Sequence, residues 1–155
     1  MQTASSSIAI AHLRQLRVLF DRIVDSMSEK DLFTVPDGFS NHVAWNVAHV
    51  VVTQQLLHYG LSGIEPTVPA DLIGSFRKGT RAGDGSAEAF RATREHIHSA
   101  VERLSDDYEA GRFERFEEYT TSAGITLASF EDALAFNNIH EGIHLGYVMA
   151  LRKGL

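Results

Sequence analysis

Four long stretches of the 155-residue chain repeat apolar residues with the 3.6-residue period of an α-helix. They cover roughly residues 7–27, 41–63, 87–108 and 130–153, and no other stretch shows a convincing alternation typical of a β-strand. A helix that is apolar on one side buries that side against other helices. The sequence therefore predicts an all-α fold, a four-helix bundle.

Capping residues predict where these helices begin. Asn41 is a good N-cap for the second helix, and Ser86 precedes the third. Ser129 is the expected N-cap of the fourth helix, with Asp132 three residues later in an arrangement close to a capping box.

A long glycine-rich connection joins the second and third helices. The stretch from Gly60 to Gly85 contains six of the twelve glycines and two of the three prolines. Pro69 is well placed to begin a short helix that ends near Phe76, and the remainder is expected to be loop. This connection is too long for a tight hairpin, so we expect a crossover between the two helices.

Composition narrows the class of protein. The length suits a single domain spanning residues 1–155. Fourteen basic and 20 acidic residues give a net charge of −6, which disfavours nucleic acid as a partner. No apolar run approaches the roughly 18 residues that span a membrane. Residues 1–20 resemble a transit peptide in lacking acids, but helical spacing continues from Ile8 to Ile23, so we expect a first helix and a cytoplasmic protein.

The chain has no cysteine and eight histidines. It therefore has no disulfide, no zinc ribbon and no thiol nucleophile of its own, which leaves the histidines as the candidate ligands for a transition metal. His140 and His144 are four residues apart, so both rings can reach one point beside the fourth helix.

A third ligand is expected from the second helix, where His42 and His49 share one stripe. They lie about 10.5 Å apart along the axis, too far to bind one ion together. His49 is favoured because it lies in mid-helix among apolar neighbours, where a polar ring needs a reason to be buried.

Each of these histidines also has a simpler interpretation, as a core residue hydrogen-bonded to a neighbour. Three rings converging without a metal would each leave a nitrogen in need of a partner, at about 1–3 kcal/mol apiece. Residues 140–144 also match the H-E-x-x-H signature of zinc proteases, with Glu141 as general base. That reading is disfavoured because none of the eleven residues after His144 is His, Asp or Glu.

Residues 41–63 (NHVAWNVAHVVVTQQLLHYGLSG) together with residues 136–151 (FNNIHEGIHLGYVMAL) resemble the DinB/YfiT-like metalloenzymes of the DinB superfamily. The specific part is Trp-x-x-x-His followed much later by His-x-x-x-His. The resemblance implies a four-helix bundle, commonly dimeric, with a divalent metal held by His49, His140 and His144. His42 matches no ligand position of the family.

The better understood branches of this family are transferases and isomerases that use a low-molecular-weight thiol, and many other members have no established activity. Three histidines leave one position open on a divalent transition metal, with Zn or Ni favoured here. We therefore expect a metal-dependent enzyme that acts on a small-molecule substrate by thiol transfer or hydrolysis. Any thiol must be external, since the chain has no cysteine. The alternatives are a non-catalytic metal-stabilised dimeric bundle and a small-ligand-binding module.

Several other residues are expected near the site. Glu141 is the candidate catalytic carboxylate, although it can equally pair with Arg or Lys on a neighbouring helix. Trp45, Asn137 and Tyr147 are candidate substrate-binding residues, while Trp45 and Tyr147 also suit a plain core position. Basic residues of the glycine-rich connection either close over the site and hold an anionic substrate or belong to a solvated loop; these are Arg77, Lys78 and Arg81.

Two glycines in the fourth helix bear on assembly. Gly142 and Gly146 lie roughly opposite the histidine stripe, and each costs about 1 kcal/mol relative to alanine inside a helix. Close approach of another backbone would compensate for that cost, so we expect a homodimer. The alternative is an exposed face that tolerates both glycines.

Overall fold

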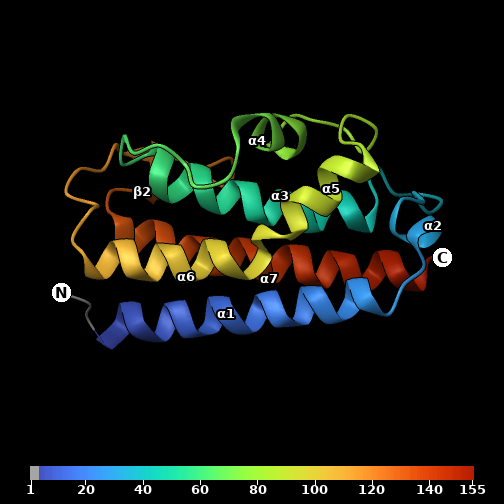
Figure 1. Cartoon of the computed structure of the whole chain (residues 1–155), viewed down its shortest axis with the longest axis horizontal. Helices are drawn as coiled ribbons and strands as arrows, with labels where there is room; N and C mark the ends of the chain where they lie inside the picture. Colours follow the sequence, from blue (N-terminus) through green and yellow to red (C-terminus); the bar gives the residue numbers. More distant parts are fainter. Residues whose placement is uncertain (1–3) are drawn as a thin grey trace.

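The computed structural model describes residues 4–155, and these residues are mostly helical (Figure 1). The long helices are α1 (Ala4–Asp25), α3 (Val43–Gln55), α6 (His96–Glu109) and α7 (Phe130–Lys153). Helix α1 packs on α7 and α6, and α3 packs on α7 and on α5 (Ala87–Arg94). The prediction of an all-α fold is confirmed. Within residues 4–155, no helix combines the length and hydrophobicity needed to cross a membrane.

Helix α3 lies in the interior. Twelve of its 13 residues are buried, so it is enclosed on all sides rather than on one stripe. The main core cluster combines its valines with Phe20 of α1, Phe90 of α5 and Leu151 of α7. A helix that is apolar all round belongs at the centre of a fold. The polar side chains of α3, apart from that of Thr53, are therefore buried in the protein interior.

The N-cap of α3 is His42, so the prediction of Asn41 is wrong. The His42 backbone is extended, and its Nδ1 accepts the hydrogen bond of the Trp45 amide at 3.0 Å. Asn41 instead accepts a hydrogen bond from the Asn46 side chain at 2.8 Å. An imidazole nitrogen thus accepts the capping hydrogen bond that the oxygen of a shorter side chain usually accepts. Ser129 caps α7 as predicted, accepting from the Asp132 amide.

The helical stretches contain more breaks than the periodicity of the sequence suggests. The π-helix η1 (Leu56–Gly60) continues α3, and Glu95 separates α5 from α6. The short helix α2 (Glu29–Leu32) follows α1, and α4 (Ala70–Phe76) begins after Pro69 as predicted. The glycine-rich stretch after Gly60 therefore contains helix α4 between its loops.

One small element of strand accompanies the helices, in a stretch where the sequence shows no alternation. Strands β1 (Tyr119–Thr120) and β2 (Thr126–Leu127) form a small antiparallel hairpin, in which Tyr119 pairs with Leu127. Strands of two residues are too short to show an alternating pattern. This hairpin lies just before α7, and its residue Tyr119 lines a cavity.

A buried ion pair connects the long helices. Arg17 of α1 donates from Nε and one terminal nitrogen to the two oxygens of Glu141 on α7, both at 2.8 Å. The same guanidinium donates to the carbonyl of Ile97 in α6 and to that of Val50 in α3. Both side chains are completely buried. Arg17 therefore contacts three other helices at one level of the fold.

Removing one partner of this pair leaves an uncompensated buried charge. We expect Arg17→Met to lower the free energy of unfolding by about 3–5 kcal/mol in urea denaturation. The double variant Arg17→Met/Glu141→Leu should recover part of that loss, since neither charge then remains. The matched control is Arg14→Met, which breaks the exposed pair of Arg14 with Glu102 and should cost less than about 1 kcal/mol. Equal effects of the two single substitutions would contradict the role given to Arg17.

Candidate metal centre

Three histidines from two helices lie together inside the fold. His49 comes from α3, and His140 and His144 come from successive turns of α7. One ring nitrogen of each lies within 4.8 Å of one ring nitrogen of the others. The centroid of the His49 ring is 5.3 Å from that of His140 and 4.8 Å from that of His144. These distances bring all three imidazoles within reach of one ion.

Hydrogen bonds orient two of the three rings. Nδ1 of His49 donates to the carbonyl of Phe76 at 2.8 Å, because a carbonyl can only accept. Nδ1 of His144 is 2.8 Å from Oδ1 of Asn46, whose Nδ2 donates to Asn41 and to the His42 carbonyl. Both rings therefore keep the proton on Nδ1 and have an unprotonated Nε2. A hydrogen bond on the far nitrogen is how proteins commonly fix metal-binding histidines.

The third ring differs. Nδ1 of His140 is buried and has no hydrogen-bond partner among residues 4–155. An unpaired buried nitrogen costs stability unless an ion or another polar group binds it. The donor set of three imidazoles, one of them with an unpaired nitrogen, fits a divalent transition metal.

Burial keeps all three rings neutral. Loss of solvent lowers the pKa of His49, lowers that of His140 to about 4 and lowers that of His144 to about 3. The neighbouring imidazoles add to the effect for His140 and His144. A neutral imidazole has the free lone pair that a metal requires. At neutral pH no proton has to leave these rings before an ion can bind.

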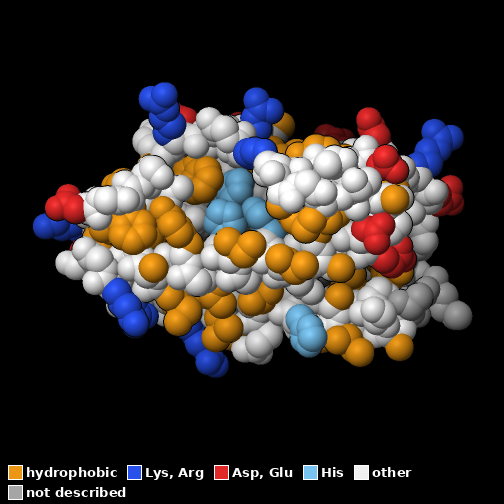
Figure 2. Space-filling view, turned by 180° about the vertical axis from the view of Figure 1, so that it is seen from behind, with side chains coloured by type: hydrophobic (Ala, Val, Ile, Leu, Met, Phe, Trp, Pro, Cys, Tyr) orange, Lys and Arg blue, Asp and Glu red, His pale blue; other side chains and the backbone are white. Residues whose placement is uncertain are grey.

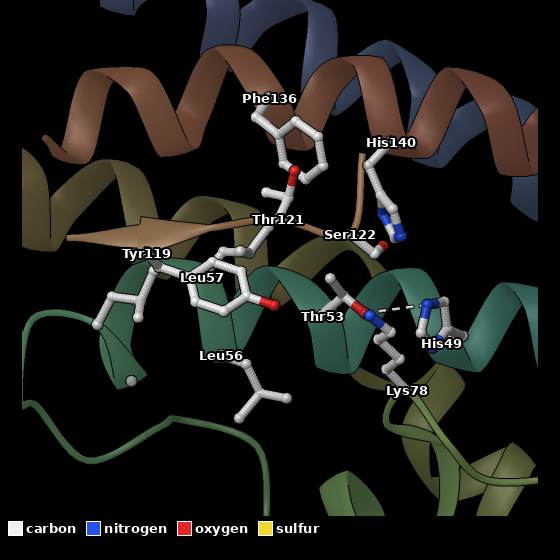
Figure 3. Close-up of a pocket in the computed structure, with 12 residues that line it drawn as sticks. His49, Thr53, Leu56, Leu57, Lys78, Tyr119, Thr121, Ser122, Phe136 and His140 are labelled. Carbon is white, nitrogen blue, oxygen red and sulfur yellow. Dashed lines mark hydrogen bonds between the residues drawn. The ribbon is translucent and has the colours of Figure 1, made fainter. Parts of the chain in front are cut away.

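A cavity of about 400 Å³ opens beside the histidines. His49 and His140 form part of its lining, and Figure 2 shows histidine side chains in a hollow with hydrophobic side chains around it. The other labelled lining residues in Figure 3 come from α3, η1, the loop after α4, the hairpin region and α7: Thr53, Leu56, Leu57, Lys78, Tyr119, Thr121, Ser122 and Phe136. A small molecule in this cavity would lie against two of the three rings.

The candidate substrate-binding residues lie outside the lining of this cavity. Trp45 stacks on His49, with ring centroids 4.5 Å apart, and its indole N–H donates to Thr80. Tyr147 packs edge-on against Phe39. Asn137 is fully buried and donates to Glu141 at 2.9 Å. Trp45 thus contacts one of the three clustered histidines, and Asn137 contacts the carboxylate that follows His140 in the sequence.

Glu141 was expected either to act as a catalytic carboxylate or to pair with a basic residue on a neighbouring helix. The structure shows the pair. Arg17 engages both carboxylate oxygens, and Asn137 adds a third hydrogen bond. Both carboxylate oxygens of Glu141 are therefore occupied by hydrogen bonds within the protein. This environment suits a fixed carboxylate and opposes a general base.

Two further histidines have core roles. His42 is buried, and its Nε2 donates to the Ala82 carbonyl at 2.9 Å. Since its Nδ1 caps α3, neither nitrogen is free for a metal. His58 is buried against Phe130, with Nδ1 donating to the Gln54 carbonyl at 2.8 Å.

Sequence reasoning missed the residues that support and surround the ligands. Asn46 and the Phe76 carbonyl orient two rings, and no pattern along the chain marks either of them. Gly85 offered a weak signal. A Cβ at that position would lie 2.2 Å from the Phe76 ring, so glycine allows Phe76 to occupy its site beside His49.

The burial of His58 predicts that the free energy of unfolding decreases in acid. Burial lowers its pKa to about 4, below the value near 6.5 of an unfolded chain. Between these values the unfolded chain binds the proton more readily, so stability falls as the pH drops from about 6.5 to about 4. His58 alone should contribute about 3 kcal/mol to that fall.

Urea denaturation of metal-free protein at several pH values measures this dependence. His58→Gln should flatten the curve, whereas the exposed control His12→Ala should leave it unchanged. An unchanged slope in His58→Gln would contradict the assignment.

Comparison with known proteins places the chain. No curated protein matches it. The sequence model of the DinB superfamily matches residues 12–148, which include the three clustered histidines, Arg17 and Glu141. That match covers most of the chain, and the chain therefore belongs to the DinB superfamily.

Proposed function

We propose that this protein binds a divalent transition metal through His49, His140 and His144 and acts as a metal-dependent enzyme on a small molecule. The observation that carries the proposal is the convergence of three neutral imidazoles, two of which line a cavity of about 400 Å³. The scaffold in this proposal is a single-domain four-helix bundle made of α1, α3, α5 with α6, and α7. Zinc or nickel is the proposed ion, since imidazole suits both.

The number of ligands favours an enzyme over a metal that only stabilises the fold. Structural zinc sites are closed by four protein ligands, whereas catalytic sites have three and an open position. Among residues 4–155 the cluster comprises three potential ligands. A divalent ion held there would activate a water or an external thiol, which supports hydrolysis or thiol transfer as the reaction.

The chain's own residues prepare the site. Asn46 and the Phe76 carbonyl hold two rings with Nε2 unprotonated, and the Thr53 hydroxyl lies 3.3 Å from Nε2 of His49. Trp45 covers one face of the His49 ring. Glu141 acts as a positioning residue in this proposal, because it joins Arg17 to the helix that carries His140 and His144.

Metal analysis tests the ligand set. Purified protein loaded with Zn²⁺ or Ni²⁺ should retain about one equivalent after gel filtration, measured by plasma mass spectrometry. His49→Ala, His140→Ala and His144→Ala should each lose most of it, because two imidazoles hold an ion far more weakly than three. His12→Ala and His42→Ala should retain the metal. Retention in all three ligand variants would contradict the proposal.

Turnover is tested separately with small thiols and electrophilic partners, and with hydrolysable esters and amides. Activity that depends on the metal and disappears in His144→Ala supports the enzyme. Activity that survives complete removal of the metal contradicts the proposed chemistry.

We also propose a homodimer formed through the outer face of α7. Ile139, Ile143 and Met149 are more than half exposed on this helix, and Gly142 and Gly146 face open space. Such an exposed apolar stripe is typical of a contact surface.

Charge supports a two-fold pairing of this helix. The first turn of α7 is acidic, with Glu131 and Asp132, and the last turn is basic, with Arg152 and Lys153. An antiparallel pair of α7 helices places each acidic end beside a basic end and brings the two Gly142 backbones close together.

Ile143→Lys should convert the dimer to a monomer, because it places two like charges next to the pairing axis. Light scattering coupled to size-exclusion chromatography measures the mass. The matched control is Ile125→Lys, an equally apolar exposed position in the hairpin region, which should remain dimeric. A monomeric parent protein would refute the dimer.

A further inference from the structure

The described residues that line the cavity beside the histidines include a positively charged side chain and no negatively charged one. Among the described residues that line it, Lys78 is the one Lys or Arg, and none is Asp or Glu. Lys78 is exposed, and no salt bridge within residues 4–155 includes it. It extends from the loop after α4 toward the cavity, near Thr53 and His49 in the view of Figure 3. This ammonium is available to a ligand.

The rest of the cavity is largely apolar. Leu57, Leu61 and Phe136 contribute to its wall. Leu56 and Tyr119 also line it although 37% and 39% of their surface remains exposed, which is high for large hydrophobic residues. Covering such side chains removes apolar surface from water and so favours a ligand with a hydrocarbon or aromatic body.

The neighbouring residue provides a contrast. Arg77 is also exposed and cationic, yet it is not among the residues that line the cavity. Among the described residues that line the cavity, Lys78 is therefore the Lys or Arg side chain that a ligand meets.

We propose that the cavity takes a small molecule with an apolar body and an anionic group, and that Lys78 selects the anion. The assignment of the ligand as a substrate rests on the proposed function, since it places the reacting end of the molecule at the histidines. Lys78 is a specificity residue in this arrangement. Its ammonium attracts a carboxylate or a similar anion, while the leucines and Phe136 hold the apolar body.

Octanoate and octanamide are suitable probes, since they share an apolar chain that suits a cavity of this size and differ in charge. Isothermal titration calorimetry on the metal-loaded full chain should show octanoate binding roughly fivefold more tightly than octanamide. Lys78→Met should remove that preference and leave octanamide binding unchanged. Arg77→Met, which loses the same charge from the adjacent position, should keep it.

Three results would overturn the inference. Failure of both probes to bind contradicts the apolar cavity as a ligand site. If Lys78→Met and Arg77→Met weaken the binding of octanoate equally, the preference reflects the net charge of the protein and not Lys78. A preference for octanoate that survives Lys78→Met but disappears with a chelator places the anion at the metal.

The same titration on metal-free protein separates this inference from the proposed function. If the chain binds no metal but octanoate still depends on Lys78, the metal proposal fails and the anion selectivity stands. If the metal binds and Lys78→Met has no effect on octanoate, the metal proposal stands and the assignment of Lys78 fails.

Discussion

The buried pair of Arg17 and Glu141 is the contact on which the arrangement of the helices depends. Two charges removed from water are stable only when each finds nearly all of its partners. Arg17 meets this demand with Glu141 on α7 and with backbone carbonyls of α3 and α6. Glu141 directly follows His140, and Val50 directly follows His49. The interaction that joins the helices therefore also sets the distance between the histidines they carry.

Burial also determines the chemistry of the histidine cluster. Exclusion of water lowers the pKa of each ring, so the lone pairs are free at neutral pH. Asn46 and the Phe76 carbonyl then decide which nitrogen carries the proton. On the other side of His49 and His140, the cavity opens toward Lys78 and the apolar side chains. The histidine rings are thus held in place by hydrogen bonds on one side and face a cavity with a charged residue on the other. A site for a small molecule needs both features.

Features that depend on neighbours along the chain were predicted well, and those that depend on packing were not. The helical periods, the Ser129 cap and the start of α4 after Pro69 all follow from local geometry. The His42 cap was missed because imidazole is a rare capping group, although its nitrogen accepts a hydrogen bond as an oxygen does. The β1–β2 hairpin was missed because two-residue strands carry no detectable period. The role of Glu141 was left open because its partner lies 124 positions away.

The sequence by itself determined that the chain is helical, that His140 and His144 share a face, and that any thiol at the site must come from outside. A helix repeats every 3.6 residues wherever it lies, and the absence of cysteine is independent of folding. Only the tertiary structure decided that His42 is occupied by its own helix cap and by Ala82, that Arg17 holds Glu141, and that Lys78 reaches the cavity while Arg77 does not. Distances between helices and loops are set by packing of the whole core, and no spacing along the chain contains them.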